Sequence, residues 1–241
     1  MESVPRPPAP LPAPGDPWVA PLWHTLALVG IFVGLTLAGA FFQSAATTQP
    51  GMVRHAGILP LYLSILLAEW ALLYFVWKGG LRRRGVSLRA LVGGRWARPV
   101  DLLRDLGLAA LLWGIWKLIA LLWDRLAGAG AAASISPLLP RGGAEILLWI
   151  LVSITAGICE EVVFRGYFYR QFAALTRSRP AAMLLQAALF GIAHGYQGIG
   201  ACARIAVYGL LFGLLAIWRR SLRPGILAHA GSDILAGILR L

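Results

Sequence analysis

Charged residues are scarce in this chain of 241 residues. Only 13% are Asp, Glu, Lys or Arg, against about 25% in ordinary soluble domains. Hydrophobic residues make up 59%, and the mean hydropathy is +0.72. These values exclude a soluble globular domain and favour long segments that lie in a bilayer.

Cysteine is nearly absent as well. Cys159 and Cys202 cannot form a disulfide framework and lack the spacing of metal ligands. An HExxH zinc motif and an internal repeat are also missing. Ser232 lacks the glycine-serine-glycine setting of a rhomboid-like nucleophile, and Asp233 lacks the GxGD of presenilin-type proteases. Several known types of membrane protease are therefore disfavoured.

Seven apolar segments are long enough to cross a membrane as helices, which takes about 20 residues. Their run lengths favour helices over the short alternating strands of a barrel. We therefore expect an all-α, polytopic integral membrane bundle with about seven transmembrane helices, in one domain over 22–241. The expected segments are 22–43, 57–77, 105–124, 143–164, 180–198, 203–218 and 224–239.

Residues 1–21 differ in composition from the rest, because they contain eight prolines. Such a segment can neither pack a core nor hold a regular helix. We expect a disordered Pro-rich tail, with His24 just beyond it at the membrane edge and solvated. The apolar segment that follows is too long for a cleavable signal peptide and has no small-residue cleavage site.

Positive charge exceeds negative charge by 12, but its distribution does not indicate a nucleic acid partner. The basic residues cluster in 78–104, 165–179 and 219–223, without an aromatic stacking pattern beside them. By the positive-inside rule, these regions and the N-terminus face the cytoplasm. The expected location is the cell (plasma or inner) membrane, with the lipid bilayer as a partner.

Polar residues recur at one expected depth in three late segments. The fourth and fifth segments form a hairpin with its tip near Arg177, and Glu160 and His194 each lie 17 residues from it. That spacing is about 25 Å along a helix. His229 lies six residues past Arg223, which places it about 9 Å deeper along its helix than Arg223. These depths agree if the hairpin projects beyond the bilayer, which predicts one site below the cytoplasmic surface.

Helical spacing assigns different roles to the two adjacent acids. Glu161 precedes Arg165 by four residues, the favoured order for an ion pair on one helical face. Glu160 points elsewhere and stays free. A glutamate beside His194 in an apolar site could accept a proton from water, and His229 would face the developing oxyanion. The implied chemistry is addition of water to an amide.

Three motifs in this order resemble the type II CAAX prenyl protease and bacteriocin-processing family, also called Abi or CPBP, over 143–239. The family pattern is EExxxR, FxxxH, then HxxxN or a variant. The resemblance implies an intramembrane endopeptidase in which Glu160 and His194 activate water and His229 supports the oxyanion. It implies a peptide or protein substrate, and only the family's name suggests C-terminal lipidation. The matching residues are Glu160, Glu161 and Arg165, then Phe190 and His194, then His229 and Asp233.

Asp233 departs from the asparagine of well-studied family members. An ionised carboxylate cannot donate a hydrogen bond to an oxyanion, so Asp233 must be protonated, orient His229 or ligate a cation. Glu160, His194, His229 and Asp233 would be acceptable zinc ligands. The sequence leaves both routes open, glutamate-dependent or metal-dependent, with a divalent metal such as zinc as the cofactor of the second.

Other functions fit parts of the sequence. Glu69 and Lys117 lie at similar depths in the second and third segments, which predicts a structural pair or part of an ion pathway. Charged residues on several helices also suit a proton- or ion-coupled transporter, although the inverted repeats of many carriers are not visible. A non-proteolytic immunity or scaffold member of the family would keep the motifs without turnover.

Overall fold

The structure, a computed structural model, describes residues 17–48, 57–93, 95–127 and 138–239. Within these ranges every regular element is helical and no strand occurs, which confirms the predicted all-α membrane bundle. The long helices are α1 (Leu22–Thr48), α3 (Ile58–Gly79), α5 (Pro99–Ala127), α6 (Gly143–Glu160), α8 (Arg179–Ala193), α9 (Ile199–Arg219) and α10 (Arg223–Leu239). Shorter elements are η1 (Leu81–Arg84), α4 (Leu88–Val92), the π-helical η4 (Glu161–Phe168), α7 (Tyr169–Thr176) and η5 (Gly195–Gln197).

Five described stretches are long and apolar enough to cross a membrane, where about seven were predicted. The other two predicted segments form α8 and α10, of 15 and 17 residues. The segment predicted over 180–198 ends early, because the chain leaves α8 at Ala193 and turns through η5. Gly198 follows with φ 94°, a backbone conformation that favours glycine. The five stretches are Leu22–Phe41, Ile58–Arg84, Pro99–Leu126, Gly143–Thr176 and Ile199–Arg219.

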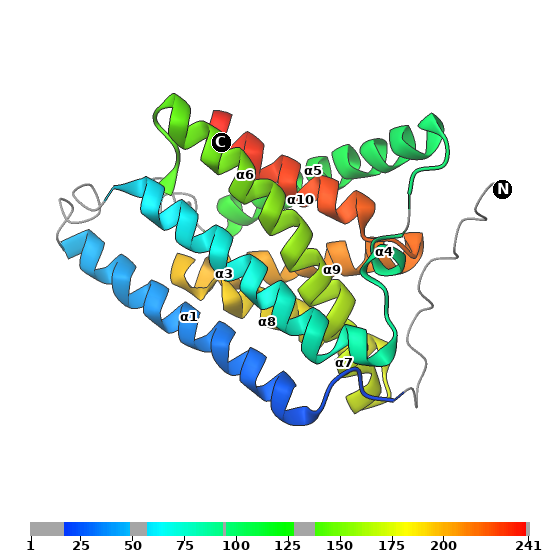
Figure 1. Cartoon of the computed structure of the whole chain (residues 1–241). Coiled ribbons are helices and arrows are strands. Elements are labelled where there is room, and N and C mark those ends of the chain that lie inside the picture. The colour runs from blue at the N-terminus through cyan, green and yellow to red at the C-terminus, as the bar shows by residue number, and fades with distance from the viewer. Residues whose placement is uncertain (1–16, 49–56, 94, 128–137, 240–241) are drawn as a thin grey trace.

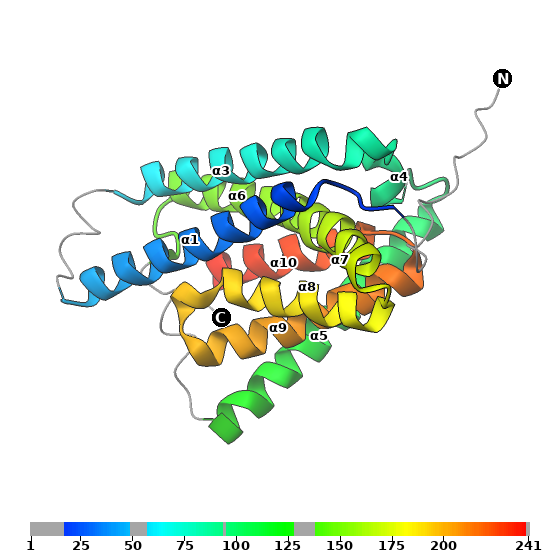
Figure 2. The same cartoon turned by 90° about the horizontal axis from the view of Figure 1, so that it is seen from below.

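One continuous helical stretch, α6 through η4 to α7, organises the bundle (Figure 1). Both α3 and α10 pack against α6, while α8 pairs with α9 and α5 lies against α10. Helix α1 lies along α8 and η5, as the second view shows (Figure 2). The elements that carry the three motifs are therefore central to the bundle.

The three basic regions meet at one end of the bundle (Figure 1). The α9–α10 turn binds the α4 region, because the Leu222 amide and the Ser221 hydroxyl both donate to the Val92 carbonyl. The α7–α8 hairpin ends beside them. Its tip is at Arg177, as predicted, where a φ of 55° ends α7. A single basic end is the arrangement that the positive-inside rule requires.

Asp105 ties α5 to this end of the bundle. Its side chain is fully buried and accepts hydrogen bonds from Arg219 Nη2 and Trp96 Nε1, each at 2.9 Å. Arg223 Nε lies 3.2 Å from Asp105 Oδ2, the oxygen that also accepts from Trp96. A buried carboxylate is tolerated when cations and donors surround it, so this cluster fixes α5 against the α9–α10 turn.

The last residues of the Pro-rich segment are packed, which corrects the prediction of disorder over 1–21. Residues 1–16 lie outside the described residues, but Val19 and Ala20 are buried, and their amides donate to Gln171 Oε1 at 2.8 and 3.0 Å. The prediction that His24 is solvated is also wrong. Its buried ring lies 2.9 Å from the Tyr167 hydroxyl. Gln171 and Tyr167, which hold these residues, are more than a hundred residues away from them in the sequence.

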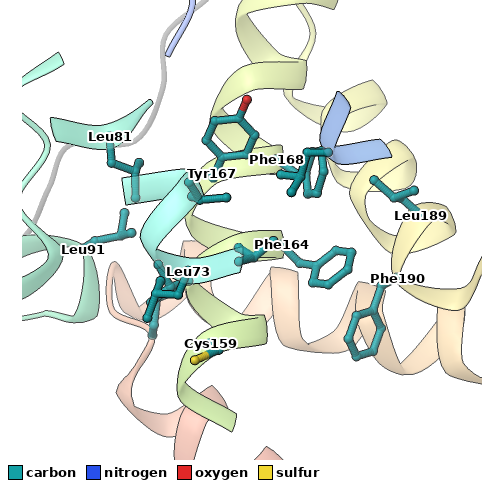
Figure 3. Close-up of a cluster of buried hydrophobic side chains, with 14 of the residues drawn as sticks. Leu73, Leu81, Leu91, Cys159, Phe164, Tyr167, Phe168, Leu189 and Phe190 are labelled. Atoms are coloured by element: carbon teal, nitrogen blue, oxygen red, sulfur yellow. The ribbon is translucent and has the colours of Figure 1, made fainter. Parts of the chain in front are cut away.

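Aromatic side chains around η4 form the main core. Phe164, Tyr167 and Phe168 are almost completely buried, and Figure 3 shows them between Leu73 and Phe190. The rings of Phe164 and Phe190 meet edge to face with centroids 5.0 Å apart, a favourable geometry for aromatic pairs. This contact holds the helix that carries the acid pair against α8.

Candidate active site

The acid pair lies where α6 changes into the π-helical η4. Glu160 is the last residue of α6 and Glu161 the first of η4. π-helical turns are rare and occur frequently at functional sites. The wider turn changes the direction of each side chain relative to a regular α-helix. Glu161 is fully buried, while the Glu160 side chain is 23% exposed.

Close approach of α10 to α6 brings His229 to the acid pair. A Cβ on Gly157 would lie 3.0 Å from the α10 backbone, and one on Gly237 would clash with Trp149. Trp149 Nε1 also donates to the backbone carbonyl of Asp233 at 2.7 Å. Small residues therefore allow the contact, as is common between membrane helices, and one hydrogen bond sets its register.

His229 contacts three carboxylates. Its Nδ1 lies 3.2 Å from Glu161 Oε1, and its Nε2 lies 3.8 Å from Glu160 Oε2 and 3.7 Å from Asp233 Oδ2. Ionised carboxylates only accept hydrogen bonds, so Nδ1 donates to Glu161, while Nε2 faces two carboxylates that lie beyond hydrogen-bond distance. The structure thus brings together three of the four predicted catalytic residues and one predicted supporting residue.

The predicted pair of Glu161 and Arg165 is present and buried. Arg165 Nη1 lies 3.0 Å from Glu161 Oε1, and Nη2 donates to the Gly209 carbonyl at 3.2 Å. The guanidinium lies 4.2 Å from the centroid of the Phe190 ring, so Phe190 supports the site by packing. Glu161 does more than predicted, because the oxygen that faces Arg165 also contacts His229.

His194 is the C-cap residue of α8. Its Nδ1 lies 2.8 Å from the Phe190 carbonyl oxygen. A carbonyl cannot donate, so we assign the hydrogen to Nδ1, which leaves Nε2 of the neutral ring as an acceptor. The Phe190 ring contacts both imidazoles, with centroids 4.8 Å from His194 and 6.0 Å from His229. Asp233 lies within electrostatic range of both Glu160 and His194.

Residues 142–235 match the family described as Type II CAAX prenyl endopeptidase Rce1-like. That match agrees with the predicted family resemblance over this segment, which is less than half of the chain. It spans α6 to α10 with all three motifs, and it begins after α1, α3 and α5. The Rce1-like match and the five apolar helices together support an integral membrane protein. Searches of curated proteins and of solved structures found no match.

Glu69 lies outside the Rce1-like segment, but it is near Glu160, His229 and Asp233. The predicted pair of Glu69 with Lys117 is wrong. Lys117 lies over an aromatic ring of its own helix. The charges that act on Glu69 are those of Glu160, His229 and Asp233. An acid inside a membrane helix is a visible sequence signal. Its partners depend on the face that α3 turns toward α6, which depth alone does not reveal.

The sequence leaves a metal-dependent route open, with Glu160, His194, His229 and Asp233 as its ligands. Among the described residues, no group of three or more His, Cys, Asp or Glu side chains is placed to hold a metal ion. The chemistry below is derived from what these side chains can do themselves.

Proposed function

We propose that the protein is an intramembrane endopeptidase that hydrolyses a peptide bond with a water molecule activated by Glu160 and His194. The observation that supports it best is the contact of His229 with the acid pair and Asp233, in a segment of the Rce1-like family. Substrates with a lipidated C-terminus are one class to test, because the family includes CAAX prenyl endopeptidases by name.

Glu160 is the proposed base. Its Oε2 is buried facing His229, but the side chain as a whole is 23% exposed, so part of the carboxylate can meet water. Glu161 is fully buried against Arg165 and is closed to that role. The acceptor Nε2 of His194 would hold and polarise the same water molecule. As the water oxygen attacks the carbonyl carbon, its proton passes to Glu160.

His229 is the proposed oxyanion donor. With carboxylate oxygens near both ring nitrogens, the imidazole that satisfies them carries hydrogens at Nδ1 and Nε2. The Nε2–H group can then donate a hydrogen bond to the substrate oxygen as negative charge develops on it. Asp233 orients this ring, because an ionised carboxylate cannot itself donate to an oxyanion.

Cleavage by the purified protein tests the proposal. In detergent, the protein should cut members of a peptide library that includes prenylated C-termini. In ¹⁸O-labelled water, one labelled oxygen should enter each new carboxyl group, as direct hydrolysis requires. Activity should survive a strong chelator; loss that zinc restores would overturn the metal-free route. A protein that cuts no member, with or without zinc, would contradict the proposal.

We also propose that the basic end of the bundle and the N-terminus face the cytoplasm of a cell membrane. In a background without Cys159 and Cys202, a cysteine introduced by Arg84→Cys should react with a membrane-impermeant maleimide only after the cells are opened. A cysteine introduced by Arg141→Cys, at the other end of the bundle, should react in intact cells. Both residues are exposed. The reverse labelling pattern would overturn this orientation.

A further inference from the structure

Glu69 approaches the site from α3, outside the family-matched segment. It lies on the same helical face as Tyr62, Leu73 and Val76, all of which are buried. That face packs against α6, where the Tyr62 and Trp149 rings have centroids 5.6 Å apart. Glu69 Oε2 is buried and has no hydrogen-bond partner among the described residues. Glu69 as a whole is half-buried, but a buried carboxylate oxygen without a partner is costly when ionised, which makes the protonation state of Glu69 a functional question.

Of the four acids near His229, Glu69 is the one with no cation close to it among the residues that the structure describes. Glu161 is paired with an arginine, while Glu160 and Asp233 both lie within 4 Å of His229 Nε2. Glu69 makes no ion pair within the described part of the chain, and two of the three charges that act on it, those of Glu160 and Asp233, are negative. Its charge is therefore the least compensated of the four acids.

Neighbouring carboxylates in apolar surroundings do not all ionise, and the least compensated one retains a proton. The other titratable groups near Glu69 are Cys159 and Tyr196, and neither supplies a positive charge. A protonated carboxyl group is a donor, and amide hydrolysis needs a proton on the departing nitrogen. We infer that Glu69 is a protonated acid of the site that donates to the leaving amine, an inference that rests on the proposed function.

The proposed cycle conserves protons. One O–H bond of water breaks, the proton goes to Glu160, and the oxygen bonds to the carbonyl carbon to give a tetrahedral oxyanion. The C–N bond then breaks as the oxyanion reforms the carbonyl, while Glu69 gives its proton to the nitrogen. The products are a carboxylic acid and an amine. Glu160 finally passes its proton to Glu69, which restores both side chains.

Two substrates that differ only at the leaving atom test this role. An amide nitrogen must be protonated to leave, whereas an ester oxygen depends on protonation far less. Glu69→Gln should therefore lower kcat for the peptide by about 10²-fold and change kcat for the matching ester much less. Glu69→Asp should recover part of the peptide activity. Ser64→Ala, which alters an exposed hydroxyl on the same helix, should change neither rate.

Equal loss on both substrates would overturn the donor role, and the proposed function would stand if wild type still cleaves and Glu160→Gln does not. Infrared difference spectra give a second readout without substrate. The spectrum of wild type minus Glu69→Gln at neutral pH should contain the C=O stretch of a protonated carboxyl group, and Glu160→Gln should retain that band. Carboxylate bands in its place would overturn the proposal. Failure of wild type to cleave any substrate would overturn it together with the proposed function.

Discussion

Glu160→Gln should reduce peptide cleavage by at least ~10²-fold, the usual loss when a general base is removed. Glutamine keeps the size of the side chain and its capacity to hydrogen-bond, but its amide cannot take a proton from water. The decrease should appear in kcat, because the proposed work of Glu160 lies in the chemical step. Purified protein and the best peptide of the library would provide the measurement.

Glu145→Gln is the matched control for this variant. It makes the same chemical change at the other end of α6, where Glu145 accepts a hydrogen bond from the Arg141 amide, and it should leave kcat unchanged. Full cleavage by Glu160→Gln would remove the base from the mechanism. The acid pair would then be a structural or ion-handling feature of the bundle.

Arg165→Met should destabilise the folded protein by about 3–5 kcal/mol, because it leaves a fully buried carboxylate without its cation. Methionine keeps much of the length and the apolar contacts of the side chain. It loses the charge that faces Glu161, the donor to Gly209 and the cation over Phe190. Equilibrium unfolding of the purified protein in mixed micelles would measure the change.

Arg98→Met gives the comparison at an exposed position. The Arg98 side chain is 73% exposed and lies 3.6 Å from Asp101, and such ion pairs contribute little. The double variant Arg165→Met with Glu161→Leu should recover part of the lost stability, because no buried charge remains. An Arg165→Met protein as stable as wild type would show that the buried pair does not hold η4 in place.

Part of the fold and of the site was predictable, because helix length, side-chain depth and i, i+4 spacing depend only on counting residues along one segment. Composition and run length determined an all-α membrane bundle, since the backbone in hydrocarbon must satisfy its own hydrogen bonds. The hairpin tip predicted near Arg177 is where expected, and the equal spacing of Glu160 and His194 from it predicted one shared depth. The i, i+4 spacing of Glu161 and Arg165 predicted their ion pair, which is 3.0 Å long.

Only the tertiary structure decided which neighbours each helix face meets. Glu69 and Lys117 have matching depths, yet Glu69 faces the acid pair and Lys117 does not reach it. His24 is buried because Tyr167 and Phe75 converge on it from two other elements. The π-helical turn at Glu161 lets both acids contact one imidazole. Depth follows from helical rise along one segment, but rotation about the helix axis is set by packing against side chains that are distant in the sequence.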